Sequence, residues 1–345
     1  MLSFMRRQRR ANDGTPDPNY TFGDSPKPGF FAGIRDDLTA AVLEYAGTTF
    51  FLLLAFGGTQ ASSSEAATSG QASNIERVMY ISLCFGFSLL CSVWLFYRVT
   101  GGLFNPDVSL ALLLTGVIGP VRFVLYCIAQ LLGGITAAAI IYALTPGPLA
   151  FNTYLAPGVN KAQGVFIEMF ITTALVLAIL MLAAEKHNAT PFAPVGIGLT
   201  LFVCHLWAVY YTGAGMNTAR AFGPAVVTGF PYHYHWIYWV GPFLGSLLGV
   251  TFYTILKHIK YWRFNPGQDT VDFRESPGDP VNHVKSAVRR SISSASRSGR
   301  SGSRSDNEEG AQANQFNEKP RAPHERGDVA DGEPARGRRP NDSAV

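Results

Sequence analysis

A few polar side chains stand in stretches that are otherwise apolar. Glu44 and Glu168 each lie in such a stretch, where a carboxylate is costly unless it has a function or a tight partner. Asn105 and Asn217 each follow a glycine-rich segment and precede a short apolar run. An Asn in that place can cap a helix with its oxygen and keep its amide free to donate. No nucleophile–base pair or metal-ligand cluster accompanies them, so we expect no enzyme, no metal site and no cofactor.

The elements that carry these residues are expected to span a membrane. Of the 345 residues, 47% are hydrophobic and only 15% are charged, and the charges gather at the two ends. Six stretches of about 20 residues have the length of a membrane span and lack the polar face of a soluble helix. They are residues 38–58, 78–97, 121–143, 164–184, 193–211 and 236–256. This pattern predicts an all-α membrane protein.

The tails differ in composition from this middle part. We expect a tail at 1–37, a channel-like domain at 38–256 and a disordered tail at 257–345, because the last segment has too few apolar residues to order itself. Lys and Arg near the span ends favour the side of the N-terminus, which predicts that both termini are cytoplasmic. The net charge of +4 is small and favours no nucleic-acid partner. The four cysteines fall inside the spans, where we expect no disulfide.

The two halves of the middle part repeat each other. Adding 112 to the numbers of several Gly, Asn and Tyr residues of the first half gives the same residue type in the second. Glu44 and Glu168 match at an offset of 124, which is explained if residues 60–77 are an inserted loop. With three spans in each copy, about 38–143 and 164–256, the second copy must be inverted, and the functional site is expected where the copies meet. The matched pairs include Gly101 and Gly213, Asn105 and Asn217, Tyr126 and Tyr238, and Gly133 and Gly245.

The segments around the two asparagines are too short to span. Each apolar run after Asn105 or Asn217 is expected to be a half-helix that enters the membrane and stops. Non-helical backbone survives at that depth only when it is buried in protein or lines a wet cavity. The glycine-rich segments before each Asn should therefore turn carbonyl groups toward a cavity. Their candidate residues are Gly101, Gly102, Leu103, Phe104, Gly213, Gly215 and Met216.

These segments resemble the paired Asn-Pro-Ala boxes of the aquaporin (major intrinsic protein) family. The resemblance covers roughly residues 38–256 and includes both glutamates, Gln130 and Arg220, while the tails resemble those of fungal members. It implies six transmembrane helices and two re-entrant half-helices in an inverted repeat, assembled as a homotetramer in the lipid bilayer of the plasma membrane. The boxes here are Asn105-Pro106-Asp107 and Asn217-Thr218-Ala219, so each departs from the family pattern at one residue.

The resemblance also implies residue roles. The family's narrow aromatic/arginine filter maps onto Phe85, His205, Ala214 and Arg220. The two half-helix N-termini and the two Asn amides would orient water and oppose cations. Glu44 and Glu168 would accept hydrogen bonds from the re-entrant loops, with a proton or ion pathway as the rival interpretation.

The departures at Asp107 and Thr218 leave two interpretations open. Asp107 lies near a half-helix N-terminus, where a carboxylate is favourable, so capping is the preferred one. Alternatively, its charge lowers the central positive potential and relaxes the barrier against cations. Thr218 loses the fixed backbone angle that Pro would supply at the first turn, which we expect to be a small local loss.

The function expected on these grounds is a passive water channel that excludes protons and ions. Hydrogen peroxide is a further candidate permeant, because it resembles water in size and polarity. An aquaglyceroporin-like solute channel is less favoured, since glycerol-conducting relatives typically have a small residue at the position of His205 and Asp at that of Ala221. The sequence also leaves open a secondary transporter and a non-conducting adhesion or sensor protein.

The tails suggest regulation. Tyr20, among prolines and phenylalanines, is a candidate gate that would plug the cytoplasmic mouth, although the aromatics could equally be scattered without function in a disordered tail. Ser291 and Ser293 follow two arginines and suit a basophilic kinase, whereas Arg-Ser stretches can also be solvated or touch anionic lipid.

Overall fold

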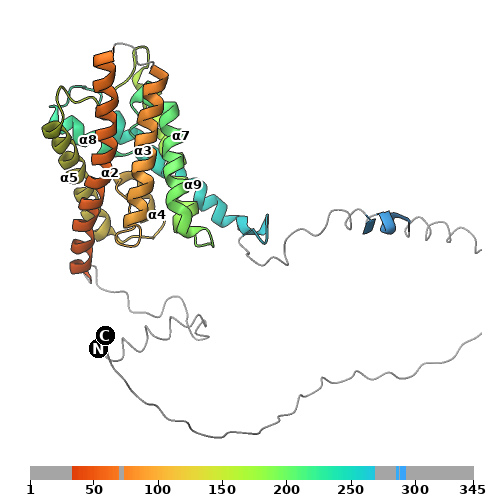
Figure 1. Ribbon diagram of the computed structural model, residues 1–345. Helices are drawn as coiled ribbons and strands as arrows, with labels where there is room; N and C mark the ends of the chain where they lie inside the picture. The colour runs from red at the N-terminus through yellow and green to blue at the C-terminus, as the bar shows by residue number, and fades with distance from the viewer. Residues whose placement is uncertain (1–32, 70–73, 269–284, 287, 293–345) are drawn as a thin grey trace, which may run out of the picture. The chain divides into compact units, whose positions relative to one another are not determined.

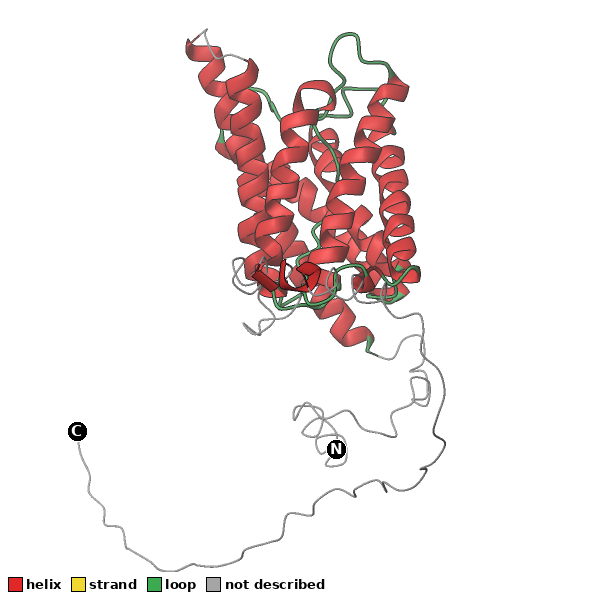
Figure 2. Cartoon of the chain, turned by 90° about the vertical axis from the view of Figure 1, so that its right-hand side faces the viewer, coloured by secondary structure: helices red, strands yellow, loops and turns green. Residues whose placement is uncertain are grey.

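The protein forms a bundle of membrane-length helices (Figures 1 and 2). The computed structural model describes residues 33–69, 74–268, 285–286 and 288–292. Within them, six helices are long and apolar enough to cross a membrane, and no strand occurs, which confirms the predicted fold class. They are α2 (Ile34–Ser69), α3 (Asn74–Phe96), α5 (Pro120–Leu144), α6 (Lys161–Ile179), α7 (Ala193–Thr212) and α9 (Ile237–His258).

Two shorter helices, α4 (Pro106–Leu114) and α8 (Thr218–Val227), follow the two asparagines. At 9 and 10 residues they are too short to span, as the sequence predicts. Both are buried largely inside the bundle, α4 against α5 and α9 and α8 against α5. Residues 285–286 and 288–292 are helical, belong to a separate unit and include Ser291. Tyr20 and Ser293 lie outside the described residues.

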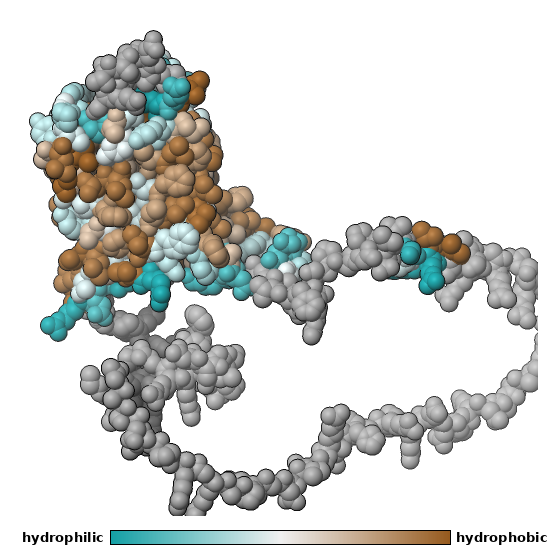
Figure 3. All heavy atoms as spheres, viewed as in Figure 1, coloured by the Kyte–Doolittle hydropathy of each residue, from teal (hydrophilic) through white to brown (hydrophobic). Residues whose placement is uncertain are grey.

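The outer surface of the bundle is apolar. Large side chains such as Phe166 on α6, Val203 on α7 and Leu95 on α3 are 55%, 60% and 62% exposed. Figure 3 shows a broad brown band of such residues between paler and teal ends. A helix that is apolar on every side belongs inside a protein or in lipid. The exposed band therefore faces the hydrocarbon of a bilayer.

Equivalent hydrogen bonds occur in the two halves. The Tyr126 hydroxyl donates to the Thr100 carbonyl at 2.9 Å, and the Tyr238 hydroxyl donates to the Thr212 carbonyl at 2.7 Å. Both pairs are related by the offset of 112. The internal similarity thus reflects a repeated three-dimensional unit.

Close helix packing repeats in the same way. A Cβ atom on Gly133 of α5 would lie 2.9 Å from the Thr48 Cβ, and one on Gly245 of α9 would lie 2.6 Å from the Thr172 Cβ. Any larger residue would force α5 away from α2, or α9 away from α6. These glycines serve packing, as small residues between membrane helices do.

The loop expected at residues 60–77 is mostly helical. Helix α2 continues to Ser69 and α3 begins at Asn74, so the insertion lengthens both helices. Gln60 is 2% exposed, and its amide holds another loop: Nε2 donates to the Pro148 carbonyl at 3.0 Å, and Oε1 accepts from the Ala150 amide at 2.9 Å. The expectation of a loop was wrong because it overlooked the helix-forming Ala and Glu residues of this stretch.

Helix α6 ends in a wider turn. Residues Leu180–Ala184 form a π-helical turn that closes with the Glu185 amide donating to the Leu180 carbonyl at 2.9 Å. Beyond it, Glu185 accepts a hydrogen bond from the Tyr253 hydroxyl and pairs with Lys257 at 2.8 Å. The ends of α6 and α9 are thereby tied together.

Candidate pore and selectivity filter

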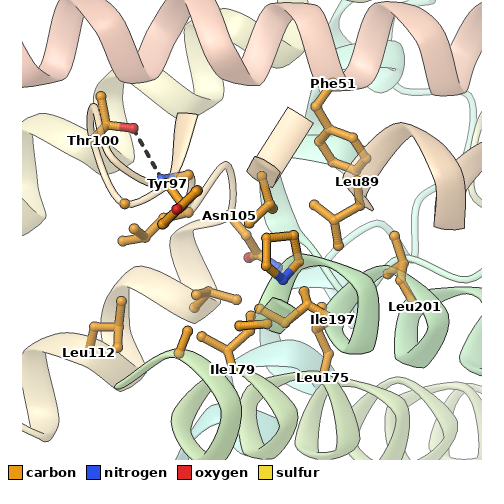
Figure 4. Close-up of a pocket in the computed structure, with 18 of the residues that line it drawn as sticks. Phe51, Leu89, Tyr97, Thr100, Asn105, Leu112, Leu175, Ile179, Ile197 and Leu201 are labelled. Atoms are coloured by element: carbon orange, nitrogen blue, oxygen red, sulfur yellow. Dashed lines mark hydrogen bonds between the residues drawn. The ribbon is translucent and has the colours of Figure 1, made fainter. Parts of the chain in front are cut away.

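Two cavities enter the bundle and meet at one side chain. The larger, about 460 Å³, runs from Arg122 and Lys186 past Asn105 to Arg220. We call it the terminal cavity, because it opens at the end of the bundle where α2 begins and α9 ends. The smaller, about 230 Å³, is lined by residues such as Asn152 and also reaches Arg220, and we call it the opposite cavity. Figure 4 shows part of the terminal cavity, where Asn105 lies among apolar side chains such as Leu89 and Ile197, with Tyr97 and Thr100 as further polar groups. The arrangement is that of a pore with one constriction.

The two asparagines meet at the centre of this pore. Each caps its half-helix: Asn105 Oδ1 accepts from the Asp107 amide at 2.9 Å, and Asn217 Oδ1 accepts from the Ala219 amide at 2.9 Å. Each Nδ2 also donates across to the other half. Asn105 Nδ2 bonds to the Met216 carbonyl and Asn217 Nδ2 to the Phe104 carbonyl, both at 2.8 Å. One Nδ2 hydrogen of each Asn remains for a molecule in the pore.

Glu168 holds the second re-entrant loop with both carboxylate oxygens. Oε1 accepts from the Thr212 hydroxyl at 2.6 Å and from the Gly215 amide at 2.9 Å. Oε2 accepts from the Met216 amide at 2.8 Å. Three donors around one buried carboxylate fix the loop that precedes Asn217.

Glu44 holds the first re-entrant loop with one oxygen. Its Oε1 accepts from the Phe104 amide at 2.6 Å and from Gln130 Nε2 at 2.9 Å. Within the described ranges, its Oε2 has no hydrogen bond of good geometry, although the Thr100 hydroxyl and the Leu103 amide lie near the carboxylate. The two glutamates occupy equivalent places but are not equally engaged.

Both re-entrant loops contain residues with a strained backbone conformation. Phe104, Ala214 and Met216 have φ of 53°, 52° and 52°, in the left-handed region that costs about 1–3 kcal/mol for a residue other than Gly. Such strain persists only when the surroundings hold it. Here the glutamates bind the amides of Phe104 and Met216, so their hydrogen bonds offset the strain.

Three of the four expected filter positions, Phe85, His205 and Arg220, lie together where the terminal cavity ends, whereas Ala214 lines neither cavity. The rings of Phe85 and His205 stack with their centroids 4.4 Å apart, and the Arg220 guanidinium carbon is 4.9 Å from the Phe85 centroid. His205 Nδ1 lies 2.9 Å from the Leu201 carbonyl and must carry its proton, because a carbonyl only accepts. In neutral His205, Nε2 is then left as an acceptor without a partner among the described residues. Ala214 is fully buried two residues after Thr212.

Arg220 is held rigidly by main-chain carbonyls. It is 3% exposed, and its Nη1 and Nη2 donate to the Phe151 and Gly213 carbonyls at 2.7 and 3.2 Å. Its Nε has no hydrogen-bond partner in the part of the chain that the structure describes. Arg220 lines both the terminal and the opposite cavity, so its positive charge lies between them.

The candidate carbonyl residues divide into two groups. Gly101, Gly102, Leu103 and Gly215 line the terminal cavity, and Gly213 lines the opposite cavity. Phe104 and Met216 line neither one, and their carbonyls accept the cross bonds of the asparagines.

Comparison with known proteins agrees with this geometry. Residues 35–253 match the family model described as major intrinsic protein. The chain belongs to the major intrinsic protein family. The protein is therefore a membrane channel and, like the rest of the family, not an enzyme.

Similar proteins in this family include aquaporins of fungi. Aquaporin-1 of Laccaria bicolor is 63% identical over 285 residues, which cover 82% of this chain and 91% of that protein. Aquaporin-7 of Botryotinia fuckeliana is 47% identical over 76% of this chain and 58% of that protein. The X-ray structure of the aquaglyceroporin from Plasmodium falciparum has a TM-score of 0.56 at 18% identity, covering 64% of this chain and 99% of that one, and it shows the shared fold.

The two departures from the family's boxes contact each other. Asp107 Oδ2 accepts from the Thr218 amide and from the Thr218 hydroxyl, both at 2.9 Å. Asp107 therefore caps the half-helix α8 of the other repeat, whereas α4, its own, is capped by Asn105. The proline that the family pattern has at position 218 would lack the amide hydrogen used here. Thr218 is thus more than the small local loss that we expected.

Three partners of the pore residues had no assigned role in the sequence analysis. Gln130 bonds to Glu44, Thr212 bonds to Glu168, and the Phe151 carbonyl bonds to Arg220. Gln130 is an amide in an apolar span, which is itself a signal of a polar role. The Phe151 carbonyl leaves no trace in a sequence, since every residue has one.

Proposed function

We propose that this channel conducts water and excludes ions and protons. The observation that carries the proposal is the constriction of Phe85, His205 and Arg220. Two stacked rings lie beside a buried guanidinium, and a small polar molecule there would find donors on Arg220 and an acceptor at His205 Nε2. A fixed positive charge at the narrowest point repels cations.

The centre of the pore supports the same proposal. The half-helices α4 and α8 direct their N-termini toward each other's caps, which concentrates positive potential there. The remaining Nδ2 hydrogens of Asn105 and Asn217 donate to one passing water oxygen. That water is then oriented so that it cannot relay a proton in both directions.

Hydrogen peroxide is proposed as a second permeant, since it is a small polar molecule that can use the same donors and acceptor. Glycerol is not favoured, because its carbon chain would have to pass between His205 and Arg220. The aquaglyceroporin of Plasmodium falciparum shares the fold at an identity too low to transfer its permeant. We also propose that the protein is a homotetramer in the plasma membrane. The terminal cavity would then open to the cytoplasm.

Osmotic shrinkage of liposomes that contain the purified protein tests this proposal. We expect fast water flux with a low activation energy, no glycerol flux and no dissipation of a proton gradient. Arg220→Val, which keeps a side chain but removes the charge, is the matched control and should let cations through. Saturable uptake coupled to an ion gradient would instead identify a secondary transporter, and a lack of any flux would indicate a non-conducting protein.

A further inference from the structure

One interaction at the centre of the channel breaks the symmetry of the repeat. The Asp107 carboxylate of α4 binds the amide and hydroxyl of Thr218 at the start of α8. The two side chains are nearly inaccessible, with 5% and 3% of their surface exposed. Their numbers differ by 111, so no local signal in the sequence links them.

The symmetry-related contact cannot form. The offset of 112 relates Asp107 to Ala219 and Pro106 to Thr218. Ala219 has no side-chain acceptor and Pro106 has no amide hydrogen. The two departures from the Asn-Pro-Ala pattern, Asp107 and Thr218, therefore contact each other. Their counterparts in the repeat, Ala219 and Pro106, keep the residues of the family pattern.

The neighbouring residues follow the same division. On the Asp107 side, the Ser246 hydroxyl donates to the Asp107 carbonyl at 2.8 Å, and also lies 3.1 Å from the Pro242 carbonyl. The counterpart of Ser246 is Gly134, where a Cβ would lie only 2.4 Å from the Ala219 carbonyl. The Thr218 hydroxyl has a second acceptor, the Tyr238 carbonyl, at 3.3 Å.

The pair lies behind the pore wall. Asn105 and Asn217 line the terminal cavity, whereas Asp107 and Thr218 line neither cavity. Thr218 directly follows Asn217, and Asp107 gives its amide to Asn105. A bond between them joins the two half-helices next to the residues that present the pore amides.

We propose that Asp107 and Thr218 are a matched pair of positioning residues, which join the half-helices and orient Asn105 and Asn217. Each makes the other favourable at its position, and the buried Asp107 carboxylate depends on Thr218 more strongly than Thr218 depends on Asp107. The inference is tested by water permeability and by thermal unfolding, and only the first of these rests on the proposed function.

This pairing predicts that the two single variants lose water permeability to different extents and that the double variant recovers it. Pro suits the first position of a helix, so Thr218→Pro brings no backbone strain of its own. It removes both donors and leaves the Asp107 carboxylate buried without them, which should lower water permeability per channel at least about tenfold. Asp107→Ala leaves only neutral donors unpaired and should lower it about two- to fivefold. The double variant restores both family boxes and should return within about twofold of the parent.

The experiment measures water permeability per channel in liposomes and thermal unfolding in detergent for all four proteins. Asp107→Asn keeps an acceptor for Thr218 and should rescue permeability, a result that mere space filling would not explain. Ser246→Ala removes a neighbouring bond outside the pair, and its effect should be the same with and without Asp107→Ala.

A double variant as impaired as Thr218→Pro, or effects that simply multiply, would overturn the proposal. If Thr218→Pro does not assemble, Thr218→Val, which keeps the amide hydrogen, takes its place in the cycle. If the parent conducts no water, the proposed function fails, while unfolding temperatures still report whether Asp107 and Thr218 are coupled.

Discussion

Replacing Glu168 by Gln tests whether the buried carboxylates hold the pore loops. Both oxygens of Glu168 accept a backbone N–H, from Gly215 and from Met216. A Gln side chain has one oxygen and one NH₂ group, so in either orientation it points a donor at one of these amides.

The free-energy cost of Glu168→Gln can be estimated from the hydrogen bonds that are lost. A hydrogen bond to a charged group contributes about 1.5–3 kcal/mol, and the unpaired amide adds about 1–3 kcal/mol. Met216 also keeps its left-handed φ of 52° without the bond that offsets the strain. We expect a total of about 2–5 kcal/mol, because the two terms overlap. At about 1.4 kcal/mol for a factor of ten, even the lower value disfavours the correctly formed loop about thirtyfold.

Glu44→Gln is the matched control. Glu44 uses only Oε1 for its bonds to Phe104 and Gln130, and a Gln oxygen can replace it while the NH₂ group takes the place of Oε2. We expect a loss of about 1–2 kcal/mol, because the two bonds to Oε1 remain but no longer involve a charged group.

The assay compares unfolding temperature in detergent and water permeability per channel in liposomes at equal protein density. Glu168→Gln should lower both strongly, and Glu44→Gln should lower both slightly. Equal losses for the two variants would refute the reasoning, since they would show that the number of engaged oxygens does not matter.

Three further predictions concern selectivity, stability and gating. Phe85→Ala with His205→Gly should admit glycerol that the parent excludes, and glycerol flux through the parent at a rate near that of water would contradict the filter assignment. Partial burial raises the pKa of Glu185, but hydrogen bonds from Lys257 and nearby tyrosines outweigh it and bring the pKa below its ordinary value. This tie therefore stabilises the fold above about pH 4.3 and is lost as the pH falls through the lowered pKa. Because the pair is partly exposed, Glu185→Gln should cost about 0.2–1 kcal/mol at pH 7 and nothing in strong acid, and a pH-independent difference in unfolding temperature would count against it. Deleting residues 1–29, which include the candidate gate, should raise water permeability per channel, and equal permeability across pH at matched density would argue against a plug.

The sequence by itself determined the membrane fold. The length and continuous apolar composition of the six stretches indicate spanning helices, because a helix pairs all the backbone polar groups of such a stretch within itself. The matched Asn, Gly and Tyr residues at one offset showed the inverted repeat and the two half-helices. The positions of Asn105, Asn217, Arg220 and the two glutamates could be located in this way, since a polar residue in an apolar repeat is itself a signal.

Only the tertiary structure decided which atoms these residues meet. The lengthening of α2 to Ser69, the use of the Phe104 and Met216 carbonyls by the opposite asparagines, and the uneven engagement of Glu44 and Glu168 depend on how the two halves dock. Asp107 and Thr218 show the reason most clearly. Each on its own looks like a local change at a helix N-terminus, and their hydrogen bonds exist only because the inverted repeat brings the starts of α4 and α8 together inside the bundle.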